Sequence, residues 1–138
     1  MNIVVIDGQG GGIGRALIEQ IKKSVPTADI TAVGTNTAAT QAMLRAGADR
    51  AATGENAVIV ACRHADVIAG PVGIVIADSL IGEITPQLAL AVAQSSAKRL
   101  LVPTNLCDNY IAGVRELNLS VLVEDCAEKI RAQFPERT

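Results

Sequence analysis

A glycine-rich turn between an apolar strand and a helix constrains this chain more than any other feature. An apolar run at residues 2–6 leads into Asp7-Gly8-Gln9-Gly10-Gly11-Gly12-Ile13-Gly14, and a helical pattern follows. Glycines allow a tight turn and let a phosphate approach the backbone, while the helix N-terminus offers N–H groups and a positive dipole end. We therefore expect a phosphate-bearing ligand at this turn, although the turn does not say what is done to that ligand.

The rest of the chain alternates between strand and helix patterns. Thr37 is a candidate N-cap for the second helix, Gly47 ends that helix, and Thr85-Pro86 is a strong helix start. The spacing of apolar residues predicts further strands at 29–33, 66–69 and 98–102, a weak one at 49–53 and a sixth at 109–115. It predicts helices at 13–24, 37–46, 55–64, from 85 onwards and at 120–133, the last with Leu122, Cys126, Ile130 and Phe134 at spacing four.

Strands that alternate with helices indicate an α/β fold with a parallel sheet covered on both faces. Right-handed crossovers then predict a doubly wound, Rossmann-like sheet of five or six strands in the order 3-2-1-4-5. We expect residues 1–138 to form a single Rossmann-like nucleotide-binding domain. Its ligand would bind at the carboxyl ends of the strands, where the order predicts the loops Asp7–Gly14, Gly34–Thr37, Gly70–Gly73 and Pro103–Asn105.

The glycine turn departs from the strict GxGxxG pattern, whose third glycine would fall at Ile13. The related patterns GxxxGxG (Gly8, Gly12, Gly14) and GxGxxxG (Gly8, Gly10, Gly14) fit, and the position between strand and helix favours nucleotide binding over a purely structural turn. Arg15 follows the glycines instead of Lys-Ser or Lys-Thr, which argues against a phosphate-loop NTPase.

The end of the second strand bears on the choice of nucleotide. Asp29 begins that strand and so lies at the wrong edge to hold a ribose, whereas Gly34, Thr35, Asn36 and Thr37 at the correct edge are neutral. A neutral edge does not repel a 2′-phosphate, so NADP is slightly preferred over NAD; alternatively, Thr37 only caps its helix. The expected cofactor-binding residues are Gly8, Gln9, Gly10, Gly11, Gly12, Ile13, Gly14, Gly34, Thr35, Asn36, Thr37, Gly70 and Pro71.

No residue can be assigned a catalytic role. Asp78, Ser79 and Glu83 lie in a long segment with the glycine content of an active-site lid, but carboxylates are also ordinary in surface loops. Residues 53–56 are either a second anion-facing helix start or a self-capped one. Asp7 is expected to anchor the glycine turn through local N–H groups. With His64 the only histidine, no metal site is expected.

Composition limits the partners. The formal net charge is −2 with scattered Lys and Arg, and there is one Tyr, one Phe and no Trp, so we expect no nucleic acid or membrane partner. A first strand at residue 2 leaves no room for a signal peptide, and three dispersed cysteines suggest reduced thiols, so we expect a cytoplasmic protein. The Ala-rich helix around residues 88–93 predicts a homo-oligomer.

Two resemblances follow from these motifs. The GxxxGIG turn resembles that of short-chain dehydrogenases, but Tyr110 is followed four residues later by Val114 instead of Lys, so their catalytic residues do not carry over. The whole chain resembles a family of small single-domain, Rossmann-like bacterial proteins known only as a domain of unknown function. That resemblance is carried by residues 4–14, 32–36, 46–49, 52–58 and 76–86, and it implies a nucleotide-like site without an established activity.

Three functions remain open. The preferred one is a sensing or carrier module that binds a phosphate-bearing nucleotide, with no assigned catalysis, because the chain has no separate substrate domain and no Tyr/Lys pair. The second is a small NAD(P)-dependent oxidoreductase whose pocket is completed by residues 70–85. The third is an interaction domain without a ligand.

Overall fold

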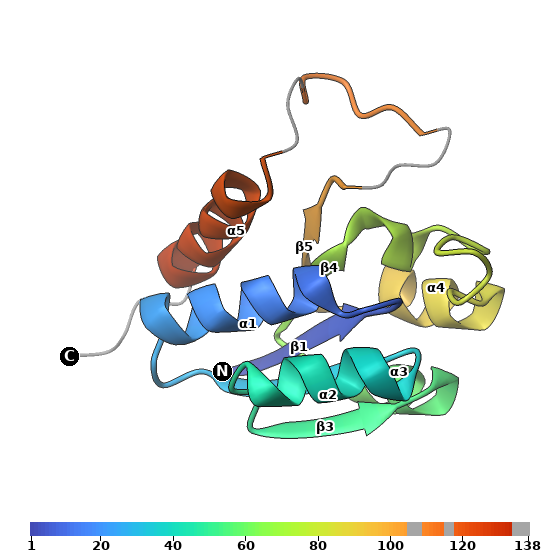
Figure 1. The fold of residues 1–138 in the computed structure, drawn as a ribbon, viewed down its shortest axis with the longest axis horizontal. Helices are drawn as coiled ribbons and strands as arrows, with labels where there is room; N and C mark the ends of the chain where they lie inside the picture. Colours follow the sequence, from blue (N-terminus) through green and yellow to red (C-terminus); the bar gives the residue numbers. More distant parts are fainter. Residues whose placement is uncertain (105–108, 115–117, 134–138) are drawn as a thin grey trace.

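The computed structural model describes residues 1–104, 109–114 and 118–133. Five parallel strands form one sheet in the order β3-β2-β1-β4-β5, which confirms the α/β fold and the predicted strand order (Figure 1). The strands are β1 (Asn2–Asp7), β2 (Asp29–Gly34), β3 (Arg50–Thr53), β4 (Val67–Pro71) and β5 (Lys98–Val102).

Helices cover both faces of the sheet, as a doubly wound topology requires. The helices are α1 (Gly12–Ser24), α2 (Thr37–Arg45), α3 (Glu55–Cys62), α4 (Pro86–Gln94) and α5 (Leu119–Gln133), and the short 3-10 helix η1 (Val72–Val75) follows β4. Helix α1 packs against α2 and α5 on one face, while α3 packs against α4 on the other (Figure 1). None of the helices in the described ranges is long and apolar enough to cross a membrane.

Strand β1 lies at the centre and supplies both halves of the core. Ile3 and Val5 pack in the cluster with α1, α2 and α5, whereas Val4 and Ile6 pack in the cluster with α3 and α4. All four side chains are buried. Burial on both faces explains why this strand is a continuous apolar run and does not alternate with polar residues.

Several predicted boundaries shift for local reasons. Asn36, not Thr37, caps α2, because its side-chain oxygen accepts a hydrogen bond from the Ala39 amide. Thr85 caps α4 as predicted. Gly70 and Pro71 belong to β4 and do not form a loop after it. Pro71 is tolerated there because it pairs only with β5; the pairing of β4 with β1 ends at Ala69.

The predicted sixth strand is wrong where it can be examined, at residues 109–114. This stretch contains a turn in which the Val114 amide donates to the Ile111 carbonyl at 3.2 Å, and Gly113 has φ +87°. A left-handed glycine inside the segment interrupts an extended strand. The predicted positions of Asn105, Arg115 and Phe134 lie outside the described residues.

Candidate functional site

The glycine turn contains two kinds of glycine. A Cβ atom at Gly8 would lie 2.7 Å from Thr35 Oγ1, and one at Gly14 would lie 2.5 Å from Met43 Sδ. Gly11 is the N-cap of α1 and has φ +73°. Packing or backbone conformation therefore accounts for these three glycines. At Gly10 and Gly12, a Cβ atom would meet no other atom within 4 Å, so the fold itself does not require glycine there.

Asp7 anchors the turn, as predicted. It is the only polar or charged residue that is buried in the described ranges, and its carboxylate accepts hydrogen bonds from Gly8 N at 2.8 Å and Gly14 N at 2.7 Å. Burial raises the pKa of Asp7, against the opposing effect of the amides of Gly14, Gly8 and Ile13, and the nearby Glu83 raises it further. The carboxylate thus already accepts a hydrogen bond from one of the free N–H groups in the first turn of α1.

The amides of Gly10 and Gly12 remain available. Across the described residues, neither amide donates a hydrogen bond, and both glycines are exposed. They line a hollow of about 410 Å³ together with Arg15 and Arg45, which project from the start of α1 and the end of α2. Glu19, Ala42 and Ala46 complete its lining. Two exposed N–H groups and two arginines that line one hollow form a donor set that suits a phosphate.

Arg45 was not among the residues predicted for the site. It lies in the last turn of α2, where a basic residue also stabilises the helix dipole, so its position in the sequence carries no specific signal for ligand binding. Neither Arg15 nor Arg45 forms an ion pair within the described part of the chain.

The loop after β2 is tied to the glycine turn. The Thr35 amide donates to the Asp7 carbonyl at 3.0 Å, and the Asn36 side-chain amide donates to the Gln9 carbonyl at 2.9 Å. The structure therefore brings Thr35 and Asn36 beside the turn, as expected. Gly34 serves packing, because its Cβ atom would lie 2.3 Å from Thr40 Oγ1. Thr37 is exposed on the first turn of α2.

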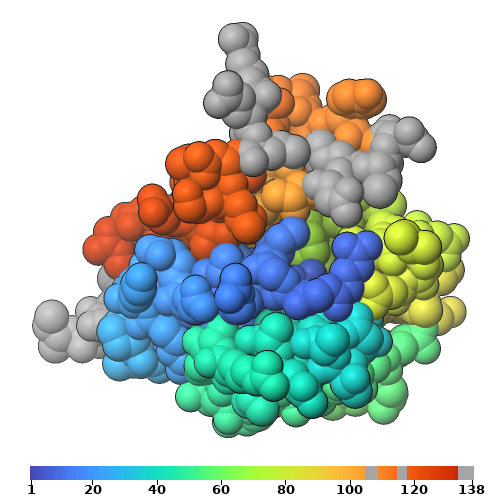
Figure 2. Space-filling model, viewed as in Figure 1, coloured from blue at the N-terminus to red at the C-terminus, as the bar shows by residue number. Residues whose placement is uncertain are grey.

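Glu83 overturns the prediction of a neutral edge beside Thr35 and Asn36. Its Oε2 accepts hydrogen bonds from Thr35 Oγ1 at 2.6 Å and Asn36 Nδ2 at 2.7 Å, and its Oε1 accepts one from Gln9 N at 2.9 Å. In Figure 2 the dark-blue segment after β1 meets the yellow-green segment that follows β4. The sequence alone does not predict this contact, because Glu83 and Thr35 are 48 residues apart.

The hydrogen bonds also decide the ionisation of Glu83. Partial burial by itself would raise the pKa of this carboxyl group, but the hydrogen bonds from Thr35, Asn36 and the Gln9 amide outweigh burial and hold the pKa below its usual value. Glu83 is therefore a carboxylate at neutral pH, and the basis for preferring NADP at a neutral edge no longer holds.

The other predicted residues lie apart from this cluster. Gly70 is buried in β4, where its Cβ atom would come within 2.3 Å of the Ile6 carbonyl oxygen, so close strand packing accounts for it. Pro71 is buried beside it. The Ser79 hydroxyl donates to the Gly73 carbonyl, and the Thr85 hydroxyl donates to the Glu55 carboxylate. These contacts hold segments together and do not present groups to the glycine turn.

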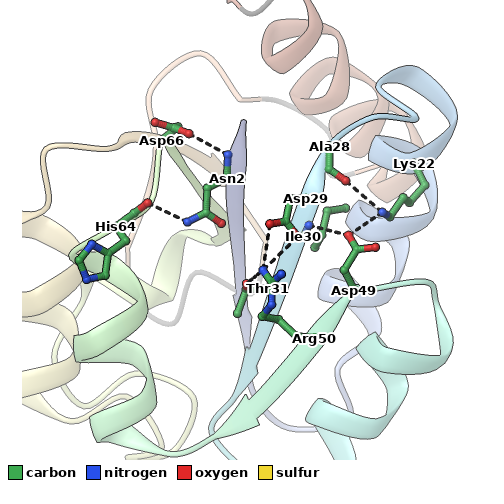
Figure 3. A network of polar contacts seen from close by, with 10 residues as sticks. All are labelled: Asn2, Lys22, Ala28, Asp29, Ile30, Thr31, Asp49, Arg50, His64 and Asp66. Atoms are coloured by element: carbon green, nitrogen blue, oxygen red, sulfur yellow. Dashed lines mark hydrogen bonds and ion pairs between the residues drawn. The ribbon is translucent and has the colours of Figure 1, made fainter.

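The amino ends of the strands carry a separate polar network (Figure 3). Arg50 pairs with Asp29 at 3.0 Å, and Lys22 pairs with Asp49 at 2.7 Å. Asp49 also accepts from the Ile30 amide, and that bond and the contact with Lys22 hold its pKa below the usual value. Asp29 thus lies at the edge away from the glycine turn, as expected, and is engaged by Arg50.

The remaining features do not suggest a reactive centre. Burial raises the pKa of the Cys62 thiol to about 11, so the group is not a thiolate at neutral pH. In residues 1–104, 109–114 and 118–133, no group of three His, Cys, Asp or Glu side chains could hold a metal ion. A second hollow of about 480 Å³ lies between α3 and α4, lined in part by Ile59, Leu90 and Ser95, and it contains none of the predicted site residues.

Comparison with known proteins identifies the family. The sequence matches the family described as a domain of unknown function (DUF3842) over residues 2–135, and the chain belongs to that family. No curated protein matches the chain. The chain is similar to the crystal structure of a dodecameric FMN-dependent UbiX-like decarboxylase from Escherichia coli, with 14% identity, a TM-score of 0.47 and coverage of 100% of this chain and 96% of that chain.

Proposed function

We propose that this protein binds a phosphate-bearing nucleotide at the glycine turn, as a sensing or carrier module with no assigned catalysis. The observation that carries the proposal is the pair Gly10 and Gly12. Neither packing nor backbone conformation requires glycine at these positions, and the amides of both have no acceptor in the described chain. A ligand that needs close backbone approach explains both features.

The surroundings of the two amides support a phosphate in particular. Gly12 begins α1, so a ligand there meets the positive end of the helix dipole. Arg15 and Arg45 line the same hollow and have no carboxylate partner within the described residues. A dinucleotide such as NAD or NADP remains the ligand class that we propose, since its pyrophosphate and sugars can span the turn and the β2 edge.

The oxidoreductase alternative receives less support. It needs residues 70–85 to complete a substrate pocket with acid–base groups. Asp78 is exposed, and its carboxylate makes no hydrogen bond within the described ranges. Ser79 is engaged by the Gly73 carbonyl. Glu83 is the titratable residue of this segment that reaches the glycine turn, and there it accepts three hydrogen bonds.

The proposal is tested by identifying what the purified protein carries and what it binds. Mass spectrometry of released ligands is paired with thermal-shift titration of NAD, NADP, FMN and ADP. We expect a phosphate-bearing nucleotide to be released, or to raise the melting temperature as saturation is approached. Because the chain has no Trp, emission from a bound reduced nicotinamide meets little protein background. If no nucleotide is released and none raises the melting temperature at millimolar concentration, the protein is an interaction domain instead.

Homo-oligomerisation also remains a proposal. In the helix that suggested it, Leu88, Ala89 and Val92 face the core, and Leu90 is 47% exposed. Val60 on the adjacent α3 is 43% exposed as well, so each of these two helices exposes a large apolar side chain. Light scattering after gel filtration measures the assembly directly; a monomer at micromolar concentration contradicts the proposal.

A further inference from the structure

Three neutral donors from two different loops converge on the Glu83 carboxylate. The Gln9 amide belongs to the glycine turn, whereas the Thr35 hydroxyl and the Asn36 side-chain amide follow β2. The three donor–acceptor distances are 2.9, 2.6 and 2.7 Å. Backbone and side-chain donors that meet at one point form the kind of arrangement that holds a bound anion.

The carboxylate occupies this place without a cationic partner. No Lys or Arg forms an ion pair with Glu83 in the part of the chain that the structure describes. The charged group that interacts with Glu83 is another acid, Asp7: burial raises the pKa of Asp7, and the charge of Glu83 raises it further. Hydrogen bonds from neutral groups therefore stabilise Glu83, as they would stabilise the phosphate of a ligand.

The segment that carries Glu83 is held in an unusual conformation. Leu80, Ile81 and Gly82 have successive positive φ values of 55°, 55° and 83°. Such values are costly for Leu and Ile and persist only where the surroundings fix them. The Leu80 side chain is buried, and its Cδ1 would lie 3.0 Å from a Cβ atom at Gly8. Packing of Leu80 against the turn thus helps to hold the backbone that presents Glu83, whereas the Ile81 side chain is 97% exposed.

We propose that Glu83 is a specificity-determining residue whose carboxylate acts as an internal anion on Gln9, Thr35 and Asn36. This inference rests on the proposed nucleotide site. While Glu83 holds these donors, a phosphate of the ligand cannot use them, so ligand phosphates are confined to the Gly10–Gly12 side. Ligand groups near the end of β2 must not be anionic, and the free hydroxyls of a ribose meet this condition. The site therefore selects a nucleotide with unsubstituted ribose hydroxyls over one with a 2′-phosphate.

The test compares NAD and NADP binding by calorimetry in the wild type and in Glu83→Gln, which keeps the shape and removes the charge. We expect the variant to shift the ratio of the two affinities toward NADP by about tenfold or more, because a close like charge is removed. Asp78→Asn is the matched control, since it removes an exposed carboxylate from the same segment, and it should leave the ratio unchanged. If NAD binds and the ratio is the same in Glu83→Gln, the inference is overturned while the nucleotide site stands.

A second readout does not depend on nucleotides. In Glu83→Ala the three donors lose their acceptor, so inorganic phosphate should shift the NMR signals of the Asn36 side-chain amide. The same titration of the wild type should leave these signals in place. Phosphate-induced shifts in the variant alone support the internal anion even if neither nucleotide binds, an outcome that would remove only the proposed function. Identical titrations of a folded variant and the wild type overturn the internal anion itself.

Discussion

The carboxylates at the two ends of the parallel sheet have different kinds of partner. At the amino ends, Asp29 and Asp49 are exposed and pair with Arg50 and Lys22 (Figure 3). At the carboxyl ends, Asp7 and Glu83 are held by neutral donors. Arg15, in the first turn of α1, and Arg45, in the last turn of α2, line the same hollow as Gly10 and Gly12, and neither has a carboxylate partner in the described residues.

This difference indicates a structural role for the amino ends of the sheet and a candidate binding site at the carboxyl ends. The pair of Arg50 with Asp29 joins β3 to β2, the pair of Lys22 with Asp49 joins α1 to the start of β3, and exposed ion pairs of this kind contribute little energy each. Arginines without partners beside unsatisfied amides leave charge and hydrogen bonding available to a ligand.

The largest effect is expected from the two aspartates that start and end neighbouring strands. Asp7→Ala removes a buried acceptor of two amides and should lower the free energy of unfolding by about 2–3 kcal/mol. Asp29→Ala removes an exposed ion pair and should cost less than about 1 kcal/mol. Urea unfolding followed by circular dichroism measures both. Equal losses would mean that the two ends of the sheet do not differ in this way.

A smaller effect should separate the glycines of the turn. Gly14→Ala places a methyl group against Met43 and the Asp7 side chain, and we expect it to destabilise the fold by about 1–2 kcal/mol. Gly12→Ala meets no neighbouring atom and lies in the first turn of α1, so it should be neutral or slightly stabilising. Thermal unfolding distinguishes the two variants. A clear loss of stability in Gly12→Ala would show that the fold does require this glycine.

The smallest effect is in the pH dependence of stability. Burial raises the pKa of Asp7 above 3.8, so its contribution is present at low pH and is lost as pH rises through the folded-state pKa. The pKa of Asp49 is lowered, so its contribution is present above 3.8 and is lost as pH falls through the folded-state pKa.

The stability lost in Asp7→Asn should therefore shrink as pH rises, while that lost in Asp49→Asn should grow. Denaturant unfolding between about pH 3 and pH 7 measures both slopes. Slopes of the same sign would contradict the assigned pKa directions.

Local patterns predicted most of the fold. Apolar runs placed four strands and the weak third strand. The signal is strongest in the central strand β1, because a parallel strand buried on both faces needs continuous apolar residues. The cap of α2 moved from Thr37 to Asn36 because either residue type can cap and only the backbone conformation decides. The sixth strand failed where it can be examined, because residues 109–111 have a strand-like composition but Gly113 bends the chain.

The site was predictable only where its signals are local. The glycine turn is one continuous stretch of the sequence and the residues after β2 are another, and the strand order brings the two stretches together. The sequence predicts Gly70 at the site because glycine signals both ligand approach and strand packing, and here the close approach of the Ile6 carbonyl accounts for this glycine. The contact of Glu83 with Gln9 joins residues 74 apart and depends on side-chain packing that no periodicity reveals.

The most direct test of the account introduces a carboxylate where the ligand phosphate is proposed to bind. Gly12→Asp should keep the fold, since a Cβ atom there meets no neighbour, while its charge repels the phosphate. Thr27→Asp is the matched control, because it adds a carboxylate to the exposed turn between α1 and β2, at the amino ends of the strands. In calorimetric titrations with NAD, we predict that Gly12→Asp weakens binding by at least about tenfold and that Thr27→Asp matches the wild type. Unchanged affinity in a folded Gly12→Asp variant would contradict the claim that this turn binds the phosphate.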